Sequence, residues 1–247
     1  MPPAGGPGYG GQQPYNVGEA FSWAWNKFSK NPAALIVPTL VYGVILGVIY
    51  GIAYGVAIAL APAPEATYSS DANGVSYSYS SGGMGAASIA VLIIGYAVLL
   101  VVGAVVQSAY ISGLLQIADG RQVAIGDFFK PRNVGAVILA SIIVGVLTAV
   151  GSLCIIGGII VALFLMFTIV ALLDRNLGAV DAVKASFDIV KDNIGNAIVA
   201  YLVMAAVLLV GAIVCGIGLI VAAPVAALFE VYTYRRLTGG QVAPLTP

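Results

Sequence analysis

Six long runs of apolar residues dominate the sequence and decide in which solvent it can fold. A helix that crosses the hydrocarbon core of a bilayer, about 30 Å thick, needs about 20 mostly apolar residues. The chain is 60% hydrophobic and 8% charged, whereas a soluble globular domain carries about 25% charged residues. The sequence therefore predicts an all-α polytopic membrane helix bundle with about six transmembrane helices. The runs are Ala33 to Leu60, Ala86 to Ile117, Val134 to Val150, Leu153 to Leu173, Ile194 to Val214 and Gly216 to Phe229, the last continuing towards Arg236.

The predicted spans form hairpins within one membrane domain, residues 17–240. Only Gly151 and Ser152 separate the third and fourth runs, and Cys215 with its glycine neighbours separates the fifth and sixth. Both pairs are therefore predicted to be tight helical hairpins. Residues 1–16 and 241–247 are predicted to be tails. The first, MPPAGGPGYGGQQPYN, lacks the features of a signal peptide and is predicted to be disordered, because it has almost nothing to bury.

The basic residues give the predicted bundle an orientation. All ten Lys and Arg residues fall on one side of a six-span arrangement, and the positive-inside rule makes that side cytoplasmic. Five or seven spans would scatter them over both sides. The sequence thus predicts a multi-pass protein of the inner (plasma) membrane with both termini in the cytoplasm. The basic residues are Lys27, Lys30, Arg121, Lys130, Arg132, Arg175, Lys184, Lys191, Arg235 and Arg236.

The long connection between the first two spans, Ala61 to Gly85, is predicted to lie outside the cell. Its stretch from Thr67 to Tyr79 alternates Ser and Tyr around Asn73-Gly74, a pair that favours the turn of a β-hairpin. A small β-hairpin and an irregular polar loop are both compatible with this pattern.

Three parallel units are predicted to make up the membrane domain, with bounds 17–118, 124–173 and 177–237. Each would consist of a cytoplasmic amphipathic helix at the membrane interface followed by two spans. The first and third amphipathic segments both begin with a carboxylate, Glu19 and Asp181, and both end twelve residues later with an asparagine, Asn31 and Asn193. Residues 125–133 resemble a shortened version of these segments.

A stripe of glycines runs along the first predicted span at Gly43, Gly47, Gly51 and Gly55. Residues four apart share one face of a helix, and glycines there allow another helix to approach closely in a membrane. Packing against another span of the same bundle is the favoured interpretation, and association with another chain is the alternative.

Two cysteines, Cys154 and Cys215, occupy equivalent places near the outer ends of the two predicted tight hairpins. They would satisfy the topological requirement for a disulfide in an oxidising compartment. The favoured interpretation is that they are small apolar residues of membrane helices, and the disulfide is the alternative.

Glu230 is the charged residue that lies within an apolar run. An ionisable residue inside a membrane is costly and is therefore a candidate functional carboxylate. Because Arg235 follows five residues later, the favoured interpretation places Glu230 at the inner interface, paired with a cytoplasmic arginine.

The absence of histidine limits the chemistry that this chain can perform. Triads and zinc sites that need histidine are excluded. We recognise no catalytic residues, metal site or cofactor site. The zero formal charge gives no reason to expect a nucleic-acid partner. The expected partners are membrane lipids and other envelope membrane proteins.

Two resemblances concern membrane architecture. The stretch AVDAVKASFDIVKDNIGNAIV, followed by GAIVCGIGLIVAAPVAALFEVYTYRRLTGG, resembles the membrane domain associated with some glycerophosphoryl diester phosphodiesterases. The Pro/Gly-rich start joined to GEAFSWAWNKFSKNP is similar to the proline- and glycine-rich transmembrane proteins of actinobacteria. The resemblance to the first family implies its membrane architecture without its catalysis, which resides in a separate soluble barrel.

These patterns favour a non-enzymatic membrane protein of the bacterial cell envelope, acting as a scaffold or accessory subunit for lipid or envelope machinery. A transporter or lipid conduit is the alternative, since parallel repeats would accommodate it.

Overall fold

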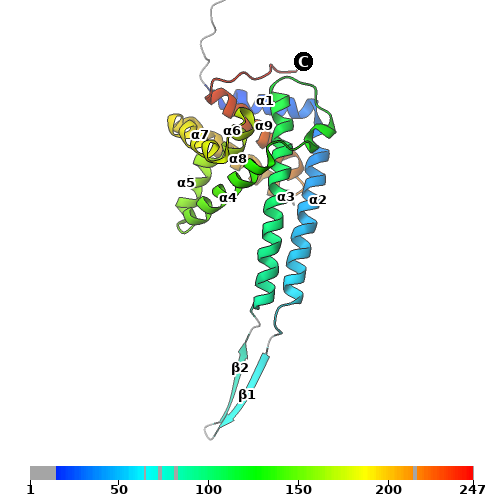
Figure 1. The fold of residues 1–247 in the computed structure, drawn as a ribbon, viewed down its shortest axis with the longest axis vertical. Helices are drawn as coiled ribbons and strands as arrows, with labels where there is room; N and C mark the ends of the chain where they lie inside the picture. The colour runs from blue at the N-terminus through cyan, green and yellow to red at the C-terminus, as the bar shows by residue number, and fades with distance from the viewer. Residues whose placement is uncertain (1–14, 64, 72–73, 81–82, 214–215, 247) are drawn as a thin grey trace, which may run out of the picture. The chain divides into compact units, whose positions relative to one another are not determined.

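A computed structural model describes residues 15–63, 65–71, 74–80, 83–213 and 216–246. The chain divides into two compact units (Figure 1). Unit 1 comprises Met1–Leu40 and Ala104–Pro247, and unit 2 comprises Val41–Gly103.

The described residues form nine α-helices, a short 3-10 helix and two strands. Their bounds are α1 Val17–Lys30, α2 Pro32–Ala59, β1 Glu65–Asp71, β2 Gly74–Ser80, α3 Ala86–Ala118, the 3-10 helix Ile125–Phe129, α4 Val134–Gly151, α5 Ile155–Leu165, α6 Thr168–Arg175, α7 Ala179–Asp192, α8 Ile194–Ile213 and α9 Leu219–Leu237.

Long apolar helices form where the sequence predicts spans. In the described part of the chain, five have the length and apolarity needed to cross a membrane: α2, α3, α4, α8 and the stretch Ile156–Arg175. Few residues of α2, α3, α4 and α8 are buried within the protein, as expected for helices that are solvated by lipid. The stretch Ile156–Arg175 is buried to a larger extent. The prediction of an all-α membrane helix bundle is therefore confirmed.

The sixth predicted span differs from the other five. Helix α9 is 19 residues long but carries Glu230, Arg235 and Arg236 in its second half. With these charged residues it is not among the helices that are long and apolar enough to cross a membrane. Much of it is buried against other helices of unit 1. Six spans thus remain a prediction, and five are supported by length and composition.

The fourth predicted span is interrupted, which the sequence did not indicate. Helix α5 ends at Leu165, and α6 begins at Thr168. The backbone N–H of Phe167 donates to the hydroxyl of Ser186 in α7 at 3.2 Å, and that hydroxyl donates to the carbonyl of Phe164 at 2.8 Å. A side chain from α7 therefore satisfies backbone groups that the interruption frees.

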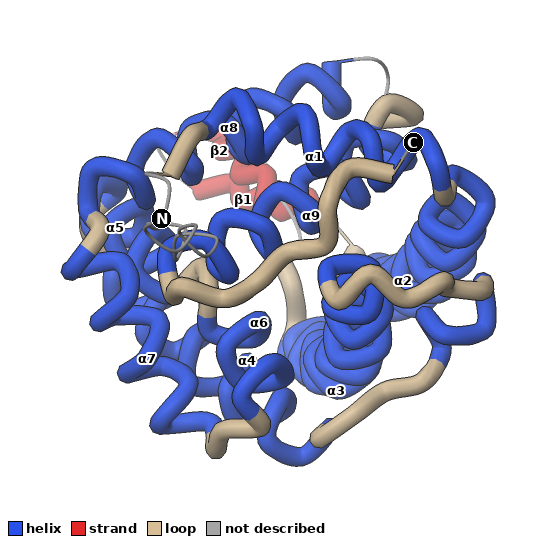
Figure 2. Tube along the Cα trace, turned by 90° about the horizontal axis from the view of Figure 1, so that it is seen from above, coloured by secondary structure: helices blue, strands red, loops and turns tan. Residues whose placement is uncertain are grey.

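Unit 1 is built around α9, which packs against α1, α6 and α8 (Figure 2). Its largest fully buried side chains include Tyr234, Phe128, Phe167 and Phe229. The ring centroids of Phe167 and Tyr234 lie 6.0 Å apart, within the range of favourable aromatic contacts. This core joins the ends of the helices in unit 1.

Helices α1 and α7 have the same length and end in the same way. Each has 14 residues and a C-terminal asparagine cap, Asn31 and Asn193. The side-chain amide of each asparagine donates to the carbonyl four residues earlier at 3.0 Å. The two helices thus agree with the predicted amphipathic segments, and the three-unit repeat itself stays a prediction.

Glycines bring the helices of both predicted tight hairpins close together. A Cβ added to Gly157 would lie 2.5 Å from the carbonyl oxygen of Gly151, and one added to Gly218 would lie 2.6 Å from that of Gly211. Larger residues would separate α4 from α5 and α8 from α9. The close turns explain the glycine spacing in these segments.

Unit 2 contains parts of α2 and α3 and a two-stranded antiparallel sheet. Strands β1 and β2 pair with Tyr68 opposite Tyr77 and Ser69 opposite Ser76, and the two tyrosine rings lie 5.1 Å apart. Of the two predicted alternatives, the β-hairpin is therefore confirmed and the irregular loop is not. Gly74 adopts a φ of 132°, while Asn73 lies outside the described residues.

Candidate functional site

An arginine near the C-terminus joins the ends of three helices. Nη2 of Arg235 in α9 lies 3.0 Å from Oδ1 of Asp119, which follows α3, and 2.5 Å from Oδ1 of Asp174 in α6. The Arg235 side chain is only 15% exposed. These contacts bring together segments that the sequence assigns to the same side of the membrane.

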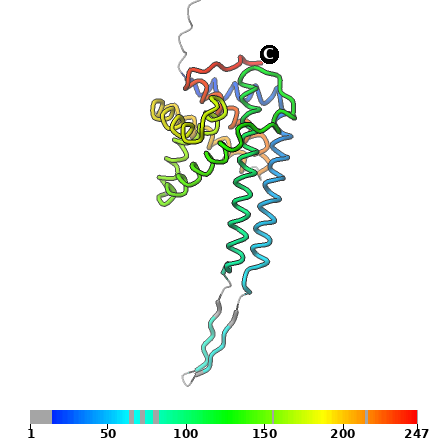
Figure 3. Tube along the Cα trace, in the orientation of Figure 1, coloured from blue at the N-terminus to red at the C-terminus, as the bar shows by residue number. Residues whose placement is uncertain are grey.

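The C-terminal strap, residues 241–246, lies against α1 (Figure 3). The indole N–H of Trp23 donates to the carbonyl of Ala243 at 2.7 Å. The ammonium of Lys27 donates to the carbonyl of Pro244 at 2.6 Å and to Oγ1 of Thr246 at 2.8 Å. The described part of the predicted tail at 241–247 thus packs on α1, which offers it hydrogen-bond donors. The domain bounds themselves stay a prediction.

The end of the predicted N-terminal tail is also packed. The hydroxyl groups of Tyr15 and Thr233 lie 3.0 Å apart, and Asn16 caps α1 by accepting from the backbone N–H groups of Gly18 and Glu19. The predicted tail thus includes two ordered residues. Residues 1–14 lie outside the described part of the chain.

Lys27 is a buried cation that binds neutral groups. Its side chain belongs to α1, and the residue is 5% exposed. Its ammonium also lies 5.8 Å from the centre of the Trp23 ring, a favourable cation–π distance. Burial lowers the pKa of Lys27 from its ordinary value of 10.5, because removing the ammonium from water disfavours its charged form.

Glu230 lines an apolar cavity of about 400 Å³ between α8 and α9. Glu230 lies seven positions before Leu237, the end of α9, and Tyr201 lies seven positions after Ile194, the start of α8. At about 1.5 Å per residue, each lies about 10 Å inside its helix. The other lining residues are Met204, Ala205, Leu208, Ala223, Ala226 and Ala227.

The favoured pairing of Glu230 with a cytoplasmic arginine is wrong. Arg235 binds Asp119 and Asp174, and Arg236 lies over the ring of Tyr232, 5.9 Å from its centre. Among the described residues, none donates a hydrogen bond to Glu230 or forms an ion pair with it. Residues five positions apart lie on different faces of a helix, so Glu230 and Arg235 contact different neighbours.

The glycine stripe is open within its own hairpin. Gly43, Gly47, Gly51 and Gly55 are all exposed, and a Cβ added to any of them would meet no described atom within 4 Å. A Cβ added to Gly95 of α3 would instead lie 2.5 Å from Cβ of Ala53. The stripe therefore does not pack against α3, because α2 presents another face to α3. Packing of the stripe against another span of the bundle stays a prediction.

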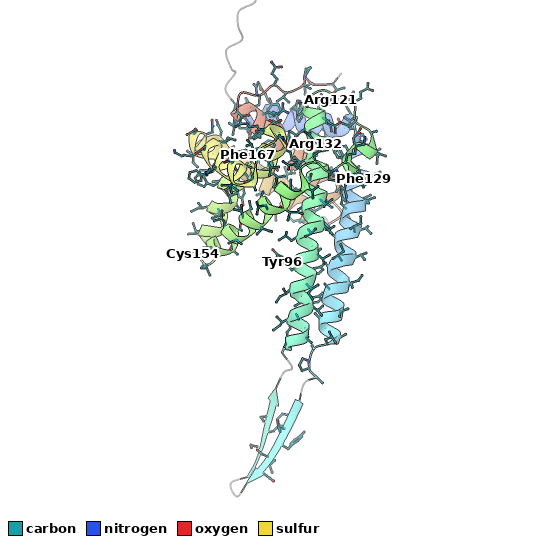
Figure 4. The ribbon with its side chains drawn as sticks, viewed as in Figure 1. Tyr96, Arg121, Phe129, Arg132, Cys154 and Phe167 are labelled. Carbon is teal, nitrogen blue, oxygen red and sulfur yellow. The ribbon has the colours of Figure 1, made fainter. Side chains whose placement is uncertain are left out.

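The predicted cysteine pair is described only in part. Cys154 is an exposed free thiol at the turn between α4 and α5 (Figure 4). Cys215 lies outside the described residues, so the disulfide stays a prediction. Among the described residues there is no cluster of three or more His, Cys, Asp or Glu residues that could hold a metal ion.

Sequence reasoning missed several residues that the fold brings together. Asp119 and Asp174 stand at the ends of predicted spans near Arg235, so opposite charges at those ends were a usable signal. The roles of Trp23 and Lys27 depend on the strap and had no local signal. Tyr201 likewise had no local signal, because it lines the cavity only through the packing of α8 against α9.

Comparison with known proteins identifies relatives of the whole chain. The chain is 37% identical over 242 residues to an uncharacterized protein of Mycobacterium bovis, covering 98% of this chain and 74% of the relative. The same identity and coverage relate it to uncharacterized proteins from two strains of Mycobacterium tuberculosis. The chain belongs to the family of these mycobacterial proteins.

Members of this mycobacterial family match over the spans and the connections alike, since the alignment covers nearly the entire chain. No family model matches the sequence. No solved structure matches it either. The relatives carry no functional description, so any function of the family has to be argued from the site.

Proposed function

We propose that this protein is a non-enzymatic scaffold or accessory subunit in the bacterial cell envelope, serving lipid or envelope machinery. In this proposal α2 offers a docking surface for a transmembrane helix of a partner membrane protein. The open glycine stripe supports the proposal most strongly. Its four members are exposed, and a Cβ added to any of them would meet no described atom of unit 2 within 4 Å.

The shape of α2 suits a second helix. Lipid provides no hydrophobic driving force for helix association, so helices in membranes associate through close backbone contact. Their interfaces are therefore enriched in small residues. Beside the stripe, Tyr50 and Tyr54 stack with ring centroids 5.8 Å apart, and both are exposed. The exposed glycines and the two stacked tyrosines thus lie on adjacent faces of α2.

The proposal also includes a location and a topology. The protein would lie in the inner (plasma) membrane with six spans, three parallel units and both termini in the cytoplasm. The one-sided basic residues support this orientation. The contacts of Arg235 with Asp119 and Asp174 are compatible with it, because they join segments that the proposal assigns to one side.

Site-specific photocrosslinking in native membranes tests the docking surface. A photoreactive residue in place of Gly51 should give a discrete protein adduct, and Gly47→Leu should abolish that adduct without lowering the amount of folded protein. A photoreactive residue at Ile52, which is 63% exposed on another face of α2, is the matched control. Lipid adducts alone at Gly51, or equal protein adducts at both positions, would contradict the proposal.

A transporter or lipid conduit is the second candidate. The observation that favours it is Glu230, which lines an apolar cavity and has no ion-pair partner among the described residues. Carboxylates of this kind commonly serve ion or substrate pathways in membrane proteins. Flux measured in liposomes that is lost in Glu230→Gln, with the folded protein retained, would favour transport over scaffolding.

A further inference from the structure

The cavity between α8 and α9 combines one charge with an otherwise apolar wall. On α9, Ala223, Ala227 and Glu230 follow helical spacing along one face, and on α8 Tyr201, Ala205 and Leu208 do the same. Both sets line the cavity. The carboxylate and the phenol lie at similar depths, each about 10 Å from the end of its helix.

We propose that Glu230 and Tyr201 form a binding site for a lipophilic ammonium ion. The ammonium group of this ligand would lie on the Glu230 carboxylate, and its apolar body would occupy the α8–α9 cavity. The inference concerns binding alone and does not depend on the proposed docking of a partner helix on α2.

The Glu230 carboxylate has no cationic partner among the described residues. A carboxylate in a low-dielectric surrounding is unfavourable unless it is paired or protonated. The nearest arginines along α9 are engaged, Arg235 with two aspartates and Arg236 with the ring of Tyr232. A ligand that brings a positive charge would gain the attraction of an unpaired carboxylate.

The size and lining of the cavity suit the rest of such a ligand. Its volume of about 400 Å³ falls in the range of about 300–1,000 Å³ found for small-molecule sites. Apart from Glu230 and the hydroxyl of Tyr201, its lining side chains are alanine, leucine and methionine. The Tyr201 hydroxyl has no hydrogen-bond partner among the described residues. An ammonium group that donates one hydrogen bond to Glu230 can donate another to this hydroxyl.

Two probes of the same shape separate charge recognition from simple apolar binding. Phenylbutylamine is an ammonium ion at neutral pH, and phenylbutanol is its uncharged counterpart. Calorimetric titration of the detergent-solubilised full chain should show the amine binding at least about tenfold more tightly than the alcohol, a difference of about 1.4 kcal/mol. Glu230→Gln should remove this preference and leave alcohol binding unchanged.

Further variants keep the test decisive if Glu230→Gln does not fold. Ala227→Leu adds bulk to the cavity wall and keeps the carboxylate, so it should reduce amine binding by about the same factor of ten. Glu19→Gln removes a carboxylate of α1 that does not line this cavity and should bind the amine as the wild type does. Equal affinity of the two probes, undiminished amine binding in both cavity variants, or no amine binding by the folded wild type would overturn the proposal.

Discussion

Oδ1 of Asp174 lies 2.5 Å from Nη2 of Arg235, so the last turn of α6 is tied to the last turn of α9. Arg235→Gln would leave the mostly buried carboxylate of Asp174 and the more exposed one of Asp119 without their cation. We expect this change to reduce the free energy of unfolding by about 1–3 kcal/mol, the usual cost of removing one partner of a buried polar contact. Thermal unfolding in detergent measures it.

The exposed pair of Lys130 and Asp127 is the matched control for this ion cluster. The Lys130 side chain is 73% exposed, so Lys130→Gln should leave the unfolding midpoint unchanged. A double-mutant cycle between Arg235→Gln and Asp174→Asn should show coupling between the two side chains. Additive effects in that cycle would mean that the contact contributes nothing.

Gly95 rather than Gly47 is the glycine whose enlargement should destabilise unit 2. Because a Cβ at position 95 would lie 2.5 Å from Cβ of Ala53, Gly95→Leu forces α2 and α3 apart and should cost about 1–3 kcal/mol. Gly47→Leu meets open space and should be tolerated by the isolated protein. The check is the unfolding midpoint of each variant in detergent, and the reverse ranking would contradict the arrangement of this hairpin.

Deleting residues 241–247 should expose Trp23. Its indole is buried and donates to the carbonyl of Ala243 at 2.7 Å. In a Trp25→Phe background, the deletion should shift the tryptophan emission to longer wavelength. In a Trp23→Phe background the same deletion should leave the emission of the exposed Trp25 unchanged, and a shift in both backgrounds would indicate general unfolding instead.

The buried ammonium of Lys27 should make stability depend on pH at the alkaline end. Burial lowers the pKa of Lys27 below 10.5 in the folded state, so the unfolded state binds more protons between the two pKa values. Stability therefore rises with pH through this window. We expect the free energy of unfolding of the wild type, relative to Lys27→Met, to increase as the pH approaches 10.5. A constant or falling difference would contradict it.

The predicted topology can be tested with exposed positions on opposite sides. Ser78 in β2 and Asp188 in α7 are both exposed; Ser186, in contrast, is buried and unsuitable for labelling. In a Cys154→Ser, Cys215→Ser background, an impermeant thiol reagent should label Ser78→Cys in intact cells. It should label Asp188→Cys only after the cells are permeabilised, and the opposite pattern would invert the topology.

Several elements were predictable from local patterns. The apolar runs predicted α2, α3, α4 and α8 almost to the residue, because both the length of a span and its apolarity are properties of one contiguous segment. The amphipathic spacing before the first and fifth spans predicted α1 and α7. Alternating Ser and Tyr residues indicated the β-hairpin without excluding a loop.

Other features depend on neighbours that are distant in sequence. The interruption between α5 and α6 is stabilised by Ser186 of α7, which nothing within the fourth run announces. The direction of Glu230 depends on the rotation of α9 relative to α8. The openness of the glycine stripe likewise depends on which face of α2 packs against α3.

The sequence by itself determined the class of this protein and its apolar helices, because hydropathy is a property of each contiguous segment. Only the tertiary structure decided which polar groups meet. It assigned Arg235 to Asp119 and Asp174, the strap to Lys27, and Glu230 to an apolar cavity. Such pairings require side chains that are separated along the chain to approach within a few ångströms, and the packing angle and rotation of each helix set that approach.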